Sequence, residues 1–160
     1  MRLRSVLAGL ALGLAACSPA REGTASAPAT QASVHPLSGL PVVPLTISHG
    51  MQRLRFRVEL ARSPAQQERG LMFRKAMGAD EGMIFPMQPP RFASFWMHNT
   101  VLPLDIVFIG ADGRIISIAA DAVPFSDAQI LSGGIAGAVL ELNAGRAREL
   151  GIEPGDRVEW

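Results

Sequence analysis

The sequence has little of what usually reveals a protein's chemistry. It contains a single cysteine in 160 residues, so no disulfide can form within the chain. It has no phosphate-binding loop, no GxGxxG after a predicted strand, no HExxH and no GxSxG, and its Ser, His and Asp residues give no triad signal above chance. These absences lead us to predict no cofactor and no metal site, and the function must be argued from individual side chains.

An excess of charge of either sign is also missing. The formal net charge is +1, but Arg2 and Arg4 lie in a leader segment, and without them 13 basic side chains face 14 acidic ones. Nucleic-acid-binding proteins normally carry a basic surface, so we predict no nucleic-acid partner. Hydrophobic residues make up 48% of the chain, which is enough for the core of the one domain expected at this length.

What is present begins with the leader. Arg2 and Arg4 precede an apolar run over residues 6–16, which is too short to span a bilayer as a mature helix. The run ends in Leu-Ala-Ala-Cys and resembles the bacterial lipobox, in which the cysteine thiol is acylated and becomes the new amino terminus. We therefore predict that residues 1–17 are a lipoprotein signal peptide ending at Cys17, and that the acyl chains hold the protein on a membrane.

The residues after this cysteine bear on location. In lipoprotein sorting signals, which the junction resembles, an Asp in the next position retains the protein at the inner membrane, and this chain has Ser18. We predict a bacterial cell-envelope lipoprotein that faces the periplasm, with the outer membrane favoured. Residues 18–43 are rich in Ala, Ser, Thr and Pro without periodicity, which indicates a disordered tether. Residues 44–160 are predicted to form a single globular domain.

The domain is predicted to be rich in short strands. Strand patterns occur at residues 53–60, 83–86, 92–97, 104–109, 114–119, 138–142 and 157–160. Asp112-Gly113 supplies the positive φ that a tight hairpin between residues 104–109 and 114–119 needs. Residues 89–90 and 122–137 are interpreted as loops. The predicted class is α+β: a compact β-rich domain, either a partly closed small barrel or a strongly curved sheet, with two short helices.

Local signals place the helices and the faces of the strands. Ser63, Pro64 and Gln66 are typical of a capping-box helix start, and this helix should end near Arg69. Asn143 is a suitable N-cap for a second helix over residues 144–150. In the strand at residues 53–60 the apolar side chains should face a core, while the charged ones, Glu59 among them, should face water.

Three ordered blocks of the sequence together resemble a known family. They read FRVELARSPAQQERGLMFRKAMGADEGMIF, FWMHNTVLPLDIVFIGADGRIISI and AVLELNAGRARELGIEPGDRV, and they resemble the domain of unknown function 192 family from about Phe56 to Val158. One departure is His98, where the family pattern usually has Lys. The resemblance implies a compact β-rich domain that is often exported and lipid-anchored, and it implies no established reaction. Family positions present here are Arg69, Gly70, Leu71, Met72, Arg74, Gly82, Met83, Phe95, Trp96, Met97, Asn99, Thr100, Pro103, Leu104, Asp105, Glu141, Gly145, Gly151, Gly155 and Asp156.

The favoured hypothesis for function is a binding or accessory module. It would hold a small polar ligand, or an envelope protein partner, in a pocket near Arg74, Trp96, Asn99, Asp105 and Glu141. The guanidinium would clamp an anion, the indole would supply a stacking face, and the amide and the carboxylates would fix orientation.

Two other hypotheses use some of the same residues. A hydrolase-like enzyme would need Asp105 and Glu141 to meet as a carboxylate pair, one protonated and one ionised. A Cu(I) site would use Trp96, Met97 and His98, because soft ligands suit Cu(I). Adjacent strand residues point to opposite faces, however, and scattered methionines are typical of core filling.

Asp105 also has two interpretations of its own, because a buried carboxylate needs partners. In the structural interpretation it accepts hydrogen bonds from the loop of Asn99 and Thr100 and holds that loop in place. In the functional interpretation it faces the pocket, with Arg74 or Arg69 as its charge partner.

Overall fold

The domain begins earlier in the chain than the sequence indicated. The structure is a computed structural model that describes residues 33–160, so the predicted signal peptide, Cys17 and most of the predicted tether lie outside the described residues. Strand β1 (Ser33–Val34) pairs with the start of β2 (Pro41–His49), and both strands begin inside the range assigned to the tether. The tether boundary at residue 43 is therefore corrected: Leu40 is buried, and a turn closed by His35 N–H and the Leu40 carbonyl ties this segment to the domain.

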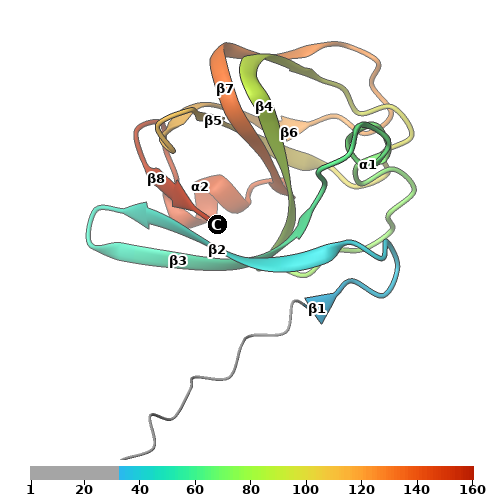
Figure 1. The fold of residues 1–160 in the computed structure, drawn as a ribbon, viewed down its shortest axis with the longest axis horizontal. Helices are drawn as coiled ribbons and strands as arrows, with labels where there is room; N and C mark the ends of the chain where they lie inside the picture. The colour runs from blue at the N-terminus through green and yellow to red at the C-terminus, as the bar shows by residue number, and fades with distance from the viewer. Residues whose placement is uncertain (1–32) are drawn as a thin grey trace, which may run out of the picture. The chain divides into compact units, whose positions relative to one another are not determined.

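One mixed sheet dominates residues 33–160. Its other strands are β3 (Gln52–Leu60), β4 (Glu81–Phe95), β5 (Leu104–Gly110), β6 (Ile115–Ala122), β7 (Ile130–Asn143) and β8 (Arg157–Glu159), joined by the helices α1 (Pro64–Arg69) and α2 (Arg146–Leu150). The order is β1-β2-β3-β4-β7-β5-β6, β8 pairs with β2, and β3–β4 is the parallel pair (Figure 1). The β-rich class with two short helices is confirmed, and the sheet is compatible with both predicted shapes.

The far strands of the sheet are linked near the chain's end. The amide of Ile115, at the start of β6, donates to the carbonyl of Asp156 at 2.9 Å, and the amide of Val158 in β8 donates to the carbonyl of Gly113 at 2.8 Å. The predicted hairpin is confirmed as β5 and β6. Within the described residues, no helix is long and apolar enough to cross a membrane.

Two strands are longer than their sequence patterns suggested. The segment at Pro89–Pro90, interpreted as a loop, lies inside β4, and a shift in the β4–β7 register between Pro86 and Arg91 accommodates residues that cannot donate to a ladder. The later part of the predicted loop at residues 122–137 belongs to β7, which starts at Ile130 despite its Ser and Gly residues. Residues 91–95, which follow the two prolines in β4, line the candidate site.

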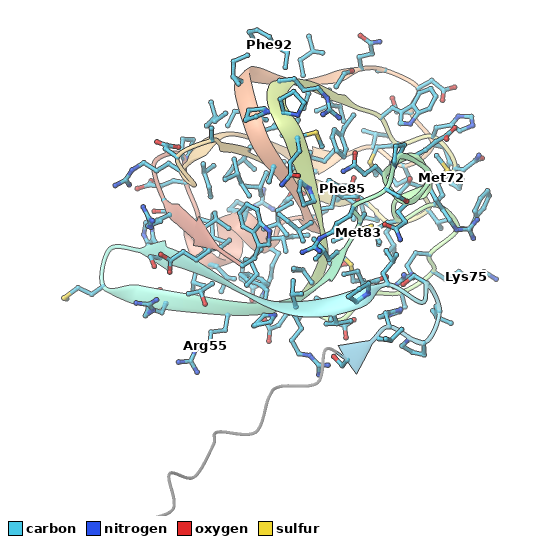
Figure 2. The ribbon with its side chains drawn as sticks, viewed as in Figure 1. Arg55, Met72, Lys75, Met83, Phe85 and Phe92 are labelled. Atoms are coloured by element: carbon cyan, nitrogen blue, oxygen red, sulfur yellow. The ribbon has the colours of Figure 1, made fainter. Side chains whose placement is uncertain are left out.

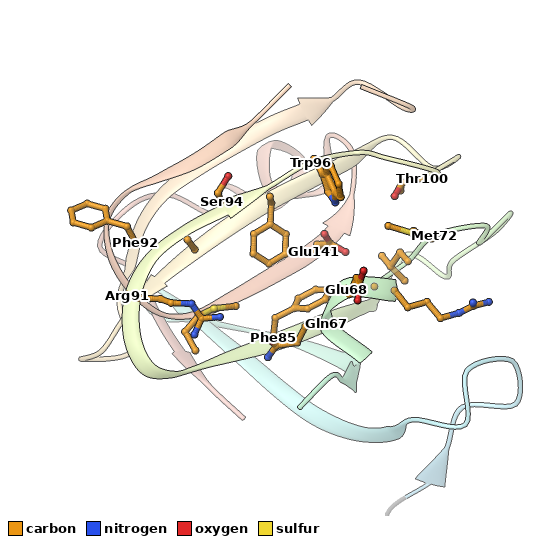
Figure 3. A pocket seen from close by; sticks show the side chains of 16 residues that line it. Gln67, Glu68, Met72, Phe85, Arg91, Phe92, Ser94, Trp96, Thr100 and Glu141 are labelled. Carbon is orange, nitrogen blue, oxygen red and sulfur yellow. The ribbon is translucent and has the colours of Figure 1, made fainter. Parts of the chain in front are cut away.

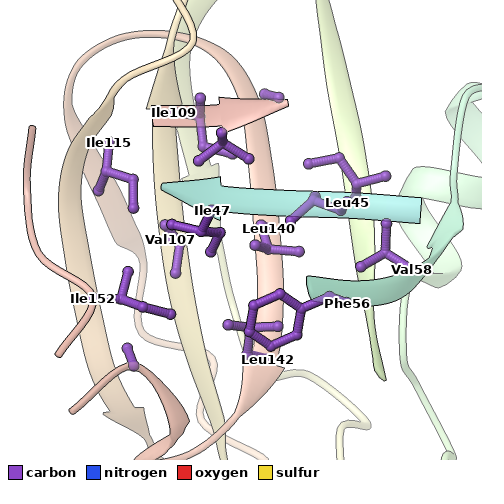
Figure 4. Packing of buried hydrophobic residues seen from close by; sticks show 14 of the residues in the cluster. Leu45, Ile47, Phe56, Val58, Val107, Ile109, Ile115, Leu140, Leu142 and Ile152 are labelled. Atoms are coloured by element: carbon purple, nitrogen blue, oxygen red, sulfur yellow. The ribbon is translucent and has the colours of Figure 1, made fainter. Parts of the chain in front are cut away.

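The sheet carries a hydrophobic core on each face, because β5 is buried on both sides. The first core gathers Val107 and Ile109 with residues of β2, β3, β7 and α2 (Figure 4). The second core gathers Ile106 and Phe108 with Met83 and Phe85. Figure 2 shows these last two side chains inside the domain, while Arg55 points away from it. The alternation of β3 is confirmed except at Glu59, which is 3% exposed and does not face water.

The two helices start differently from one another. Helix α1 has the predicted capping box: the Ser63 hydroxyl accepts from the Gln66 amide, and the Gln66 side chain accepts from the Ser63 amide. Helix α2 is not capped by Asn143, whose side chain donates instead to the carbonyls of Met77 and Gly78. Its N-cap is Gly145, at φ 78°, a residue without a side chain to accept a bond. The acceptor that α2 lacks comes from β5.

Candidate functional site

The acceptor is Asp105, a fully buried carboxylate. Its Oδ1 accepts from the amides of Asp121 and Gly145, both at 3.0 Å, and its Oδ2 accepts from the amide of Ala147 at 2.9 Å. A carboxylate that receives several backbone N–H groups at the start of a helix is well satisfied. Asp105 thus accepts hydrogen bonds within the fold, as in the structural interpretation. Its donors, however, belong to β6 and the start of α2 and not to the loop of Asn99 and Thr100.

The second predicted carboxylate, Glu141, lies on the other face of the sheet. Residues opposite each other on antiparallel strands share a face, and β5 and β7 align Asp105 with Leu142 and Ile106 with Glu141. Asp105 therefore faces the first core, and Glu141 faces the second. This register keeps the two carboxyl groups apart, so the structure does not bring together the pair that a hydrolase-like mechanism requires.

Glu141 is the one buried carboxyl in residues 33–160 without any partner. The residue is 5% exposed, and its Oε2 is buried with no hydrogen bond to any described residue. Burial disfavours the charged form and raises the pKa of Glu141 from 4.5 to about 8. At neutral pH the carboxyl is therefore mostly protonated, and a perturbed carboxyl that lines a cavity is a candidate for a functional site.

Glu141 borders a cavity of about 240 Å³ between the second core and the solvent. Figure 3 shows it in the middle of the lining side chains, with Trp96 and Thr100 on one side and Phe85 and Gln67 on the other. Helix α1, the turn after it and the long strand β4 supply most of the lining. The lining residues are Gln67, Glu68, Arg69, Gly70, Leu71, Met72, Phe85, Met87, Arg91, Phe92, Ala93, Ser94, Phe95, Trp96, Thr100 and Glu141.

Two exposed arginines lie at the edge of this cavity. Arg69 ends helix α1, and its guanidinium lies 5.8 Å from the ring centre of Phe73. Arg91 projects from β4. Neither forms an ion pair with any residue between 33 and 160, although Glu68 and Glu141 line the same cavity. The cavity therefore offers free guanidinium groups at its edge and a free carboxyl at its base.

Arg74, predicted to clamp an anion, is already bound by a carboxylate. Its Nη1 lies 2.8 Å from Glu59 Oε1, and its Nη2 donates to Oε2 at 3.0 Å, in a pair buried from solvent. Ser38 donates to the same carboxylate, and His35 Nε2 lies 3.6 Å from Glu59 Oε1. Arg74 borders a separate hollow beside residues 37–40 and is not among the residues lining the Glu141 cavity. The pairing explains why Glu59 is buried.

The loop after β4 places its predicted residues in different environments. Trp96 is half-exposed at the cavity mouth and stacks on His98, with ring centres 5.0 Å apart. His98 also pairs with Asp127 at 2.6 Å. Met97 is fully buried in the second core, so the three residues of the Cu(I) hypothesis do not converge on one point. Asn99 sits at φ 52°, and its backbone carbonyl accepts a hydrogen bond from the amide of Phe73. Asn99 is not among the residues that line the cavity.

Sequence reasoning therefore located part of the site and missed part. Of the predicted residues, Trp96 and Glu141 line the cavity, whereas Arg74, Asn99 and Asp105 do not. The arginines at its edge were not proposed as a pair, because Arg91 follows two prolines in a segment interpreted as a loop. Among the described residues, no three His, Cys, Asp or Glu side chains are grouped as metal ligands.

Comparisons with known proteins identify an uncharacterised family and two solved relatives of the domain. A family model, DUF192, described as "Uncharacterized ACR", matches residues 45–160. A solved protein of unknown function from Novosphingobium aromaticivorans DSM 12444 is 54% identical, with a TM-score of 0.78, over 85% of this chain and 94% of that chain. A transcription-regulator candidate from Sinorhizobium meliloti 1021 is 43% identical, with a TM-score of 0.73, over 75% of this chain and 94% of that one. No curated protein matches the chain significantly.

Proposed function

The chain belongs to the DUF192 family, and we propose that its domain is a binding module whose small polar ligand enters the cavity above Glu141. The observation that carries this proposal is the unpartnered carboxyl of Glu141 at the cavity base. Leaving a buried polar group without a hydrogen bond costs about 1–3 kcal/mol. A ligand that supplies the missing partner recovers that free energy on binding.

The composition of the cavity supports the same proposal. Small-molecule sites are concave and carry a few polar groups that fix the orientation of the ligand. Here Phe85 and Phe95 of β4 lie beside polar side chains such as Gln67 and Thr100, and Arg69 and Arg91 stand at the edge. These two arginines take the anion-binding role that the sequence suggested for Arg74.

A ligand screen against the mature domain tests the proposal. Compounds that raise the melting temperature of the parent protein are expected to lose most of their effect on Glu141→Gln, which keeps the shape of the side chain but cannot ionise to meet a cationic group of the ligand. Glu153→Gln is the matched control, because Glu153 is exposed to solvent and does not line the cavity. Ligands that bind the parent and Glu141→Gln equally well would place the binding site elsewhere.

We also propose that the protein is a lipid-anchored, periplasm-facing envelope protein, with the outer membrane favoured. The support is the basic start, the short apolar run and the Leu-Ala-Ala-Cys sequence ending at Cys17. Metabolic labelling with a radioactive fatty acid should mark the parent protein and not Cys17→Ser. Persistent labelling of this variant would contradict acylation at Cys17, and fractionation of the labelled membranes distinguishes the outer from the inner membrane.

A further inference from the structure

The geometry points to a specific ligand class for the cavity: a small zwitterion whose N–H-bearing ammonium group meets Glu141 and whose anionic group meets Arg69 or Arg91. This inference rests on the proposed binding function and adds the chemistry of the ligand. Three features of the cavity carry it, and each constrains a different part of the ligand.

The first feature is the kind of partner that Glu141 lacks. An ionised carboxylate is an acceptor on both oxygens, and no described residue donates to its Oε2. A primary or secondary ammonium supplies both the N–H donors and the opposite charge, so it satisfies the group completely. A quaternary ammonium supplies charge without donors and would leave the oxygen unpaired.

The second feature is the aromatic surroundings of the cavity. Phe85, Phe92, Phe95 and Trp96 line it, and the Phe85 and Phe95 rings meet edge to face with centres 5.2 Å apart. Aromatic faces attract cations through the ring quadrupole, most strongly where water is excluded. An ammonium group beside these rings would keep favourable contacts on the sides that Glu141 does not reach.

The third feature is the pair of arginines at the edge. A simple cation approaching the cavity would be repelled by Arg69 and Arg91, which have no ion-pair partner between residues 33 and 160. A ligand with an anionic group at its outer end turns this repulsion into attraction, because guanidinium groups bind carboxylate and phosphate well. The arrangement of charges therefore favours a zwitterion over a simple amine.

Binding of such a ligand must be coupled to a proton. Glu141 holds its proton until about pH 8, and the ammonium needs the ionised form, so binding at neutral pH releases the proton of Glu141. The other charged side chains that line the cavity are Glu68, Arg69 and Arg91, and all three are exposed. Affinity is therefore expected to increase as the pH rises from 6 toward 8.

The experiment uses calorimetric titration of the mature protein with three probes. O-phosphoethanolamine carries both the ammonium and an anion, phosphocholine replaces every N–H with methyl groups, and inorganic phosphate lacks the cation. We expect O-phosphoethanolamine to bind, and the other two to bind weaker by about tenfold or more, because one charge-assisted bond is lost. Titration in buffers of different ionisation enthalpy should show proton release.

Matched variants assign the contacts. Glu141→Gln should weaken O-phosphoethanolamine by about tenfold or more and abolish proton release, and Arg91→Gln should weaken it while leaving proton release intact. Glu153→Gln, at an exposed residue outside the cavity, should change neither quantity. Vesicles containing phosphatidylethanolamine identify the source: binding to both vesicles and free probe indicates a lipid headgroup, and binding to the free probe alone indicates a soluble ligand.

Three outcomes would overturn the inference, and the first two of them spare the proposed function. Phosphocholine binding as tightly as O-phosphoethanolamine would contradict the need for N–H donors. If none of the three probes binds while other compounds do bind in a Glu141-dependent manner, the cavity is a binding site for a different class. If no screened compound depends on Glu141, the proposed function fails as well.

Discussion

Two buried carboxylates on neighbouring strands of this protein differ in the hydrogen bonds that they accept. Asp105 on β5 and Glu141 on β7 are both buried, and the register puts them on opposite faces of the sheet. Three backbone amides donate to Asp105, whereas Glu141 has a buried oxygen with no donor. Burial alone therefore does not separate these two carboxylates, and the supply of hydrogen-bond partners does.

The difference follows from what each carboxylate adjoins. Asp105 lies beside the start of α2, whose N-cap is a glycine, so the helix has free amides and the carboxylate has free acceptors. Glu141 adjoins aromatic and aliphatic side chains of β4 and a cavity, none of which donates to its Oε2. The first arrangement is complete within the fold, and the second leaves an unpaired oxygen, which the proposed ligand would satisfy.

The largest expected effect is on the pH dependence of stability through Glu141. Its pKa rises from 4.5 in its ordinary state to about 8 in the folded protein, and each unit of difference is worth about 1.4 kcal/mol. The folded state therefore holds a proton that the unfolded state has lost between pH 4.5 and 8. The stability contribution is fully present below pH 4.5 and falls as the pH rises, by up to about 5 kcal/mol at pH 8.

Replacing Glu141 with Gln, which resembles the protonated form, should remove this dependence. The variant should be close to the parent in stability at pH 5 and more stable by several kcal/mol at pH 8.5. Urea unfolding of both proteins at four pH values measures the difference, and groups common to both cancel in the comparison. Parallel stability profiles would show that Glu141 finds a partner in solution, and the contrast with Asp105 would disappear.

An intermediate effect is expected at Glu59, the buried carboxylate that is satisfied by an opposite charge. Glu59→Gln leaves the Arg74 guanidinium buried beside an uncharged amide, and removing one member of a buried pair costs about 3 kcal/mol or more. The control is Glu81→Gln, because that carboxylate is exposed and accepts from a single amide, that of Gly78. A loss at Glu59 no greater than at Glu81 would mean that the buried pair adds nothing to stability.

The sequence predicted the elements of this fold better than their lengths. The capping box of α1 and the Asp-Gly hairpin depend on residues within a few positions of one another, so local chemistry determines them. The lengths of β4 and β7 depend on each other, because a register shift lets Pro89–Pro90 lie within a strand that pairs with β7. No pattern within either segment reveals that pairing.

The candidate site was predictable only in part for the same reason. Glu141 was identifiable as a carboxylate within an apolar strand, and Trp96 as an aromatic residue in a polar loop. The pairing of Arg74 with Glu59 was not, because the two residues come from separate elements and Glu59 continues an alternation that places charges in water. That Asp105 and Glu141 face opposite sides also depends on the β5–β7 register, which the sequence of either strand does not specify.

The smallest of the three effects is expected at Asp105, and it tests the other side of the comparison. Asp105→Asn keeps the size of the side chain but replaces one acceptor oxygen with an NH₂ group, which must then face the amide of Ala147 or those of Asp121 and Gly145. We expect a loss of about 2 kcal/mol in the free energy of unfolding. Asp112→Asn is the control, because Asp112 is exposed and accepts from one amide, that of Arg114, so its loss should be smaller.

Ligand binding by Asp105→Asn decides whether the two carboxylates are as separate as the register implies. Asp105 is not among the residues lining the cavity and faces the first core, whereas Glu141 faces the second. A variant that is less stable but binds ligand with the parent's affinity, at a temperature where both proteins are folded, fits a carboxylate that only holds α2 and β6. A variant as stable as the parent that no longer binds ligand would assign Asp105 to the site. The three hydrogen bonds that Asp105 accepts from backbone amides would then position the ligand-binding surface. Burial with full hydrogen bonding would no longer indicate a purely structural role.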